Sequence, residues 1–208
     1  MAYFPMFIEL KDEACVVIGG GTVAYRKIKA LLEFEAKVTV VAPEFCANIT
    51  ALENNIIKKQ KTYDTTDIEE AFLVIAATND FDLNQRISRE CRERKIPVNV
   101  VDLKEECSFI FPAYVKKGDI TAGVTTSGKS PIISQKIKKK MNEIIPDYLT
   151  ELVDHLGNIR EEIQSSFEEE ERRKKVFKQL VELGCLKHGK LTDEVVREII
   201  QNEKENGD

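Results

Sequence analysis

The chain has 208 residues and a formal net charge of −5, from 31 basic and 36 acidic residues. This length is ample for a hydrophobic core, so neither disulfides nor a structural metal is needed to stabilise the fold. With 42% hydrophobic and 32% charged residues, the composition is that of a soluble globular protein and excludes a disordered one. The negative net charge argues against a nucleic-acid partner.

Targeting and membrane signals are missing from the sequence. No apolar run reaches the roughly 18 residues that a membrane helix needs. The first ten residues have no basic n-region and contain Pro5 and Glu9, unlike a signal peptide. The five cysteines are scattered without Cys-x-x-Cys spacing, which argues against a disulfide framework and a zinc site. We therefore predict no membrane partner, no resident metal and a reducing, cytoplasmic location.

The first hundred residues alternate short apolar, mostly β-branched runs with helical patterns. The runs predict strands over 14–18, 38–41, 56–63, 72–77 and 98–101. Apolar residues at helical spacing predict helices over 22–34, 44–53 and 83–96. Strands that alternate with helices form right-handed βαβ units. The fold class is therefore α/β, with a Rossmann-type doubly wound parallel sheet.

The pattern changes near Cys107. Two strands are predicted over 109–115 and 120–125, joined by a hairpin turn over 116–119. Ser130 suits a helix N-cap and Pro131 the first helical position. The helix that follows carries one apolar face and ends at Pro146; the face consists of Ile133, Ile137, Met141 and Ile144.

The remainder is helical and highly charged. Asp147 is predicted to cap a helix with the apolar stripe Leu149, Val153, Leu156, Ile159 and Ile163. Acids followed by bases over 168–175 predict a second helix, which ends at Gly184 and buries Val176, Phe177, Leu180 and Val181. A last helix starts at Thr192 and buries Val195, Val196, Ile199 and Ile200. We predict three parts: a dinucleotide domain over 1–112, a hairpin and helix segment over 113–146, and a C-terminal helical domain over 147–208.

The strongest local motif is Gly19-Gly20-Gly21-Thr22-Val23-Ala24, which fits G-x-G-x-x-G/A between a predicted strand and a predicted helix. Glycines permit a tight turn and let the backbone approach a pyrophosphate, while the helix N-terminus offers free N–H groups. A purely structural glycine turn is the alternative. In this strand–turn–helix context the motif favours dinucleotide binding.

The acid that usually holds the ribose hydroxyls should end the second strand. Here that strand continues through Ala42-Pro43-Glu44, so the acid comes a residue or two late. Glu44 either reaches a ribose hydroxyl or caps the following helix. No Arg follows the strand to hold a 2′-phosphate, which favours NAD over NADP.

Two further segments follow predicted strands. The small residues of 76–80 would let a cofactor lie across the sheet edge, while Asn79 or Asp80 caps the next helix; both roles can hold together. Asp102 follows the fifth strand, where a carboxylate can take a proton as hydride leaves the substrate. From its position alone, Asp102 is more often a cap or a solvated residue.

Taken together, these segments resemble the precorrin-2 dehydrogenases, the family of the siroheme synthase N-terminal module and its stand-alone relatives. The resemblance covers about residues 3–150 and rests on several segments in the family's order. These are 4–7 (FPMF), 19–27 (GGGTVAYRK), 38–43 (VTVVAP), 76–80 with Asn84, 98–102 (VNVVD), 108–113 (SFIFPA) and 125–131 (TTSGKSP). The chain lacks a methyltransferase domain and so resembles the stand-alone form.

Two residues depart from the family pattern. The first helix in the family ends in Gly-Ala, whereas this chain has Glu35-Ala36. Glu35 therefore occupies a left-handed cap, or the loop differs. The family turn S-T-G-G-x-S-P has Ser127 in place of a glycine, which puts the shape of this substrate-side loop in question.

The resemblance implies NAD-dependent oxidation of precorrin-2 to sirohydrochlorin, with Asp102 as the catalytic acid/base. It also implies a homodimer formed through the middle segment. Some members insert Fe²⁺ into sirohydrochlorin and others do not, so this activity stays open. The implied cofactor-binding residues are Gly19, Gly21, Thr22, Val23, Pro43, Glu44, Ala77, Thr78 and Asn99. The implied substrate-binding residues are Thr126, Ser127, Gly128, Lys129 and Ser130.

An anionic tetrapyrrole needs a basic binding face even on an acidic protein. The densest basic cluster consists of Lys129, Lys136, Lys138, Lys139 and Lys140, for which a solvated surface is the alternative. His155 and His188 are too far apart in sequence to indicate a metal site, although His155 is a candidate for transient proton or iron handling. An NAD(H)-sensing regulatory module without catalysis is the alternative function, because it would need the same glycine turn.

Overall fold

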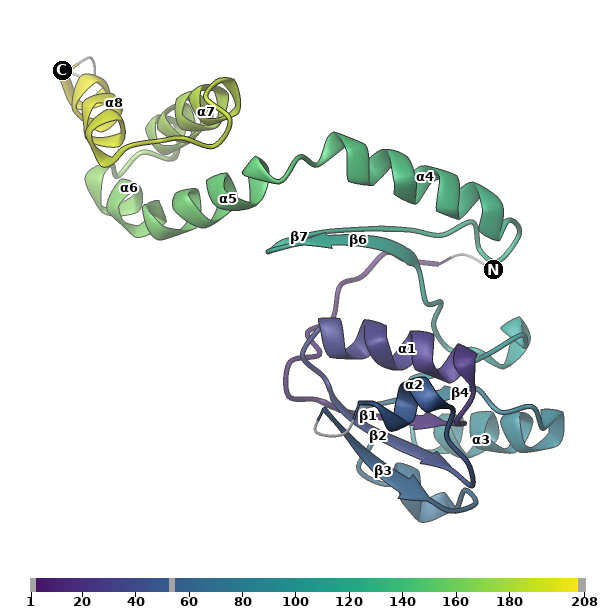
Figure 1. Cartoon of the computed structure of the whole chain (residues 1–208). Coiled ribbons are helices and arrows are strands. Elements are labelled where there is room, and N and C mark those ends of the chain that lie inside the picture. The colour runs from purple at the N-terminus through teal and green to yellow at the C-terminus, as the bar shows by residue number, and fades with distance from the viewer. Residues whose placement is uncertain (1–2, 53–54, 206–208) are drawn as a thin grey trace. The chain divides into compact units, whose positions relative to one another are not determined.

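The computed structural model describes residues 3–52 and 55–205. Predictions that touch 1–2, 53–54 and 206–208 lie outside the described residues: the start of the chain, the end of the helix expected over 44–53, and the last residues of the C-terminal domain. The chain divides into two compact units, Met1–Phe111 and Pro112–Asp208 (Figure 1). The further division of the second unit near residue 146 stays a prediction. Among the described helices, none is long and apolar enough to cross a membrane.

The first unit is built on a five-stranded sheet, as predicted. Its order is β3-β2-β1-β4-β5 and every neighbouring pair is parallel. The strands are β1 (Ala14–Ile18), β2 (Lys37–Ala42), β3 (Ile56–Gln60), β4 (Leu73–Ala76) and β5 (Val98–Val100). The chain starts at β1, adds β2 and β3 on one side, and then crosses to β4 and β5 on the other. This doubly wound topology confirms the predicted Rossmann-type α/β fold.

Helices cover both faces of the sheet because strand side chains alternate between them. The helices are α1 (Thr22–Glu33), α2 (Ala47–Thr50) and α3 (Phe81–Glu93), with the short 3₁₀ turns η1 (Thr65–Ile68) and η2 (Lys104–Glu106). Cys15 and Val17 of β1 pack in a core with α1 and α2, whereas Val16 and Ile18 pack in a second core with α3. Both faces of β1 are thus buried, which explains its continuous apolar run.

Two elements of the first unit are shorter than predicted by three residues or more. The helix expected over 44–53 shrinks to α2, because the Cys46 N–H donates to the Gly20 carbonyl at 2.8 Å and holds the preceding residues extended. Strand β3 ends at Gln60 and does not reach Tyr63, since the chain there turns into η1. Asp64 caps η1 by accepting the Thr66 N–H at 3.0 Å.

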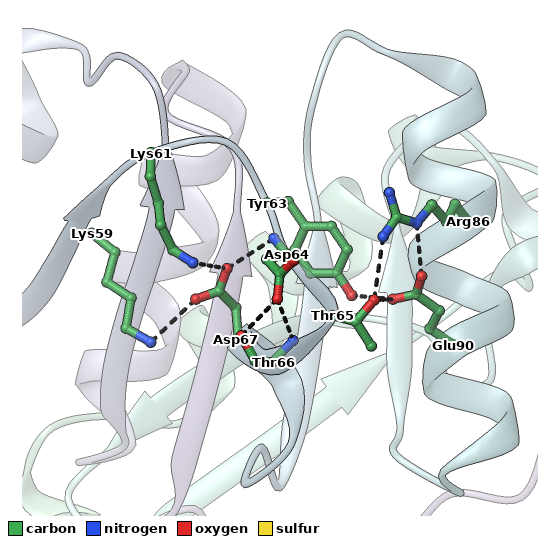
Figure 2. A network of polar contacts seen from close by, with 9 residues as sticks. All are labelled: Lys59, Lys61, Tyr63, Asp64, Thr65, Thr66, Asp67, Arg86 and Glu90. Carbon is green, nitrogen blue, oxygen red and sulfur yellow. Dashed lines mark hydrogen bonds and ion pairs between the residues drawn. The ribbon is translucent and has the colours of Figure 1, made fainter.

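Two carboxylates tie this crossover to the sheet and to α3 (Figure 2). Asp67 of η1, with only 2% of its side chain exposed, pairs with Lys61 at 2.8 Å and Lys59 at 3.2 Å. Glu90 of α3 accepts hydrogen bonds from the Tyr63 hydroxyl at 2.5 Å and from Arg86 at 2.7 Å. Burial opposes ionisation of both carboxylates, but these hydrogen bonds lower the pKa of each below its ordinary value.

The second unit begins with an antiparallel hairpin, β6 (Ala113–Lys117) and β7 (Ile120–Val124), with Gly118 at φ 52° in the turn. The first strand lies four residues later than expected at its start. Residues 108–109 run along β5 instead, where the Ser108 N–H donates to the Val98 carbonyl at 2.9 Å. Helix α4 (Pro131–Ile144) packs against the hairpin (Figure 1). The predicted cap is confirmed: the Ser130 hydroxyl accepts the Ile133 N–H at 3.3 Å.

The rest of the second unit is helical. Its helices are α5 (Tyr148–Asn158), α6 (Arg160–Ser166), α7 (Glu170–Leu186) and α8 (Asp193–Glu205). Their shared core consists of Ile163, Phe167, Val176, Leu180, Val196 and Ile200. The single helix expected after Asp147 is broken at Ile159, between α5 and α6. Asp147 does not cap α5 with its side chain, because that carboxylate pairs with Lys117 at 2.9 Å.

Gly184 was expected to end the helix that begins with the acids and bases of 168–175, and this prediction is wrong. Helix α7 continues to Leu186, and a Cβ on Gly184 would collide with the Leu152 side chain of α5. The glycine therefore permits close helix packing. The helix ends instead with His188 at φ 51°, after which the Gly189 N–H donates to the Gly184 carbonyl at 2.8 Å. Val181, expected to be buried, is exposed.

Candidate functional site: a dinucleotide cradle at the carboxyl edge of the sheet

Four loops meet where the parallel strands end. The Gly19 N–H donates to the Val41 carbonyl at 2.9 Å, and the Ala77 N–H donates to the Ile18 carbonyl at 2.8 Å. The Val101 N–H donates to the Ala76 carbonyl at 2.9 Å. The loops after β1, β2, β4 and β5 therefore lie side by side. The strand order reverses between β1 and β4, and this is where open α/β sheets bind ligands.

The glycine turn after β1 requires glycine for two different contacts. Gly19 has φ 127°, and a Cβ there would collide with the Ala77 carbonyl. A Cβ on Gly20 would collide with the Glu44 carbonyl. A Cβ on Gly21 would meet no described atom within 4 Å, so the space beside this residue is open. The first two glycines let the loops close together, and the third leaves the backbone accessible to a ligand.

Helix α1 starts at this open position. Gly21 is its N-cap, with no side-chain hydrogen bond and no acidic residue in the first turn, and Thr22 and Val23 are exposed. A helix N-terminus without a capping side chain keeps its N–H groups available and carries a partial positive charge. A dinucleotide pyrophosphate fits this cradle, because it supplies the oxygen acceptors that these N–H groups lack.

The loop after β2 presents Pro43 and Glu44, both exposed. The Gln60 side-chain amide donates to the Pro43 carbonyl at 3.2 Å and fixes the loop from the β3 side. Cys46, not Glu44, is the N-cap residue of α2, and no side chain caps that helix. Of the two roles considered for Glu44, capping is therefore excluded, and the contact with a ribose hydroxyl stays a prediction.

The loop after β4 is held by a buried amide. The Thr78 hydroxyl donates to the Asn84 Oδ1 at 2.7 Å, and the Asn84 Nδ2 donates to the Thr78 carbonyl at 3.0 Å. Asp80 caps α3 by accepting the Leu83 N–H at 3.0 Å, as predicted. Ala77 and Thr78 thus form a rigid wall beside the glycine turn, which suits both proposed roles of this segment.

Asp102 lies two residues beyond β5, at the same edge. It is exposed and its backbone has φ 61°, a left-handed conformation that Asp adopts more readily than most residues other than glycine. Asn99, expected at the cofactor, is buried in β5 and its amide donates to the Phe109 carbonyl at 3.1 Å. This bond holds the segment after η2 against the sheet.

The expected substrate loop, 126–130, belongs to the second unit. The Thr126 hydroxyl donates to the Ser130 carbonyl at 2.9 Å and accepts the Ser130 N–H at 3.0 Å. Ser127 has φ 55° and Gly128 has φ 75°, so the serine keeps a left-handed conformation where the family has glycine. Gly128 and Lys129 are exposed and available to a ligand.

Residues 123–130 also match G-x-x-x-x-G-K-S, the sequence pattern of phosphate-binding loops. The geometry does not build such a loop. The N–H groups of Ser127, Lys129 and Ser130 all bond within the segment, to Thr125 Oγ1, the Thr126 carbonyl and Thr126 Oγ1. The next residue, Pro131, has no N–H, so little of the backbone is left to cradle a phosphate.

The basic and histidine candidates are also in the second unit. Of the lysine cluster, Lys138 lies over the Tyr114 ring at 5.3 Å, and Lys129, Lys136, Lys139 and Lys140 are exposed. The His155 Nε2 is buried and has no hydrogen-bond partner in the described part of the chain. His188 contacts the Tyr148 ring edge-on at 5.2 Å. Across residues 3–52 and 55–205, no group of three or more His, Cys, Asp or Glu side chains could hold a metal ion.

Comparison with known proteins gives one family model and a set of longer relatives. Residues 6–113 match a model described as putative NAD(P)-binding. The chain is 36% identical over 176 residues to the siroheme synthase of Ruthia magnifica subsp. Calyptogena magnifica, covering 84% of this chain and 37% of that protein. It is 38% identical over 184 residues to the siroheme synthase of Thioalkalivibrio sulfidiphilus (strain HL-EbGR7), covering 88% and 38%. The chain therefore spans well under half the length of these relatives.

Among solved structures, the chain is similar to "SirC, precorrin-2 dehydrogenase". The TM-score is 0.79 at 24% identity, over 98% of this chain and 100% of that one. At this identity the likeness establishes the fold.

Proposed function

The chain belongs to the family described as putative NAD(P)-binding, and we propose that it oxidises precorrin-2 to sirohydrochlorin with NAD⁺. The observation that carries this proposal is the joining of the Gly19–Gly21 cradle and the exposed Asp102 at one sheet edge. The siroheme synthase relatives support the substrate.

The reaction removes two hydrogens from precorrin-2, one as hydride and one as a proton. A bound nicotinamide dinucleotide would supply the acceptor for the hydride. The N–H groups at the start of α1 would hold its pyrophosphate and so fix where the cofactor lies. The Asp102 carboxylate takes the proton from the substrate carbon framework as the new double bond forms. Its exposed position leaves it free to approach the substrate and to release the proton to water.

NAD is proposed over NADP because of the loop after β2. Glu44 places a carboxylate there, which accepts hydrogen bonds from ribose hydroxyls and repels a 2′-phosphate. Gln60 fixes the Pro43 carbonyl and so limits the movement of this loop. The preference is measured as the ratio of kcat/KM with the two cofactors.

The test of the proposed function is Asp102→Asn. This change keeps the shape of the side chain and removes its basicity, so turnover should fall by at least about 100-fold. The assay follows sirohydrochlorin absorbance with precorrin-2 and NAD⁺, and NADH binding is measured in parallel and should be unchanged. Glu105→Gln, an exposed carboxylate three residues away, is the matched control. Full activity in Asp102→Asn would remove its assigned role. Tight NADH binding by the unaltered chain, without any tetrapyrrole turnover, would favour the sensing module.

Insertion of Fe²⁺ into sirohydrochlorin is a second proposed activity, with the metal ion as substrate. Such a step needs only a transient ligand, and His155, with its unpartnered Nε2, is the candidate residue. The same assay with added Fe²⁺ or Co²⁺ tests it through the appearance of the metallated product spectrum.

We also propose a cytoplasmic homodimer. All five cysteines are free thiols, which suits a reducing compartment. The apolar face of α4 supports self-association, because Ile133, Ile137 and Ile144 are 51%, 38% and 74% exposed in the single chain.

A further inference from the structure

Lys27 of α1 is a half-buried cation with an unusual environment. Its ammonium lies 3.9 Å from the centre of the Phe111 ring. Burial lowers the pKa of Lys27, and the neighbouring Cys107 sulfur partly opposes this effect. In the part of the chain that the structure describes, Lys27 takes part in no ion pair, whereas most of the other lysines of the first unit are exposed or pair with Asp or Glu.

The position of Lys27 links it to both halves of the proposed site. Helix α1, which carries it, begins at the pyrophosphate cradle. Cys107, its neighbour, accepts the Val100 N–H at 3.1 Å and donates to the Leu103 carbonyl at 3.4 Å. Val100 and Leu103 flank Asp102. The thiol therefore ties the loop of Asp102 to β5, and its sulfur acts electrostatically on Lys27.

A partly desolvated ammonium without an anionic partner is unfavourable, and an aromatic face offsets only part of that cost. An anionic group bound next to the Lys27 ammonium would offset the rest of this cost. We propose that Lys27 binds a carboxylate of the tetrapyrrole substrate. This inference rests on the proposed function, and it adds a substrate-binding residue on the first unit that is distinct from the lysines of the second.

The test is Lys27→Met, which keeps the apolar stem over Phe111 and removes the charge. We expect KM for precorrin-2 to rise about tenfold, because one charged contact is lost. The kcat and the KM for NAD⁺ should stay within about twofold, since neither the proton acceptor nor the cradle is changed. Lys27→Arg should restore most of the affinity. Lys29→Met, an exposed lysine on the same helix, is the matched control and should behave as the unaltered chain.

A second measurement separates binding from catalysis and folding. Sirohydrochlorin is titrated into each variant without NAD, and its absorbance change gives the dissociation constant; Lys27→Met should again weaken binding about tenfold. If Lys27→Met unfolds, Lys27→Gln replaces it in both measurements. Unchanged tetrapyrrole affinity in a folded, uncharged variant would overturn the inference while leaving the dehydrogenase intact. A rise confined to the KM for NAD⁺ would also overturn it. Absence of turnover in the unaltered chain would instead overturn the proposed function.

Discussion

Glu35 is a residue other than glycine that adopts a left-handed backbone conformation at the end of a helix. Glu35 has φ 59° directly after α1. Around it, the Glu35 N–H donates to the Leu32 carbonyl at 3.0 Å and the Ala36 N–H to the Leu31 carbonyl at 3.2 Å. This is a Schellman motif, in which glycine is the preferred residue. Glu35 therefore replaces the glycine of the family pattern but keeps the left-handed conformation, which lowers the stability of the fold.

Replacing Glu35 with glycine should recover that cost. A left-handed conformation is unfavourable for a residue with a Cβ, so Glu35→Gly should raise the free energy of unfolding by about 1 kcal/mol. Its ion pair with Lys11, at 3.6 Å, is exposed and contributes little. Urea unfolding should show a higher midpoint at an unchanged m-value. Lys29→Gly, in the middle of α1, should lower stability by about 1 kcal/mol. A lower midpoint in Glu35→Gly would contradict this account.

At the scale of elements, the crossover from β3 to β4 is held mainly by charge. Helix α3 packs through apolar residues, but η1 is short and contributes chiefly Ile68 to the core. The buried Asp67 carboxylate joins η1 to β3 through two lysines (Figure 2). The fixed position of β4, and with it the wall formed by Ala77, depends in part on this network.

The network predicts a loss of stability in acid. The pKa values of Asp67 and Glu90 are lower in the folded state than in the unfolded chain, where they are about 4. Stability from these groups is therefore fully present above about pH 5 and falls as the pH drops through about 4 toward their folded pKa values. Asp67→Asn should lower the free energy of unfolding by about 2 kcal/mol at pH 7, and by less as the pH approaches 3. Thermal unfolding from pH 7 to pH 3 measures this. Glu69→Gln, an exposed carboxylate beside η1, should follow the unaltered chain. A pH-independent deficit in Asp67→Asn would contradict the electrostatic explanation.

At the scale of the molecule, the second unit leaves part of its apolar surface uncovered. Helix α4 buries Ser134, whose hydroxyl contacts Thr126 and Ser130, while its isoleucines remain exposed. In the single chain this face is unfavourable, because contiguous apolar surface in water tends to be covered by a partner. A second copy is the partner that the family resemblance implies.

We expect the unaltered chain to be a dimer and Ile133→Glu to be a monomer, because a buried unpaired charge is strongly unfavourable at an apolar contact. Light scattering coupled to size-exclusion chromatography measures the mass, and circular dichroism checks that α4 stays helical. Gln135→Glu adds the same charge at another exposed position of α4 and should leave the dimer intact. A monomeric mass for the unaltered chain would refute the proposed dimer.

Local sequence patterns predicted the order and type of most elements. The alternation of β-branched runs with helical stripes is a local property, and so are the caps at Asp80 and Ser130. Local patterns predict these features because the backbone hydrogen bonds they need are made within a few residues. The glycine turn was recognisable for the same reason, as strand, turn and helix are adjacent in the chain.

Other features depend on contacts between distant parts of the chain, which no local pattern reveals. The segment before α2 is held extended by the hydrogen bond from the Cys46 N–H to the Gly20 carbonyl. Residue 184 must be glycine because the Leu152 side chain of α5 packs directly against it. The Asn99 amide donates a hydrogen bond to the Phe109 carbonyl. The environment of the Lys27 ammonium is set by the Phe111 ring and the Cys107 sulfur. Each of these depends on residues far apart in sequence. Burial and steric exclusion, which set their roles, arise only when separate elements pack together.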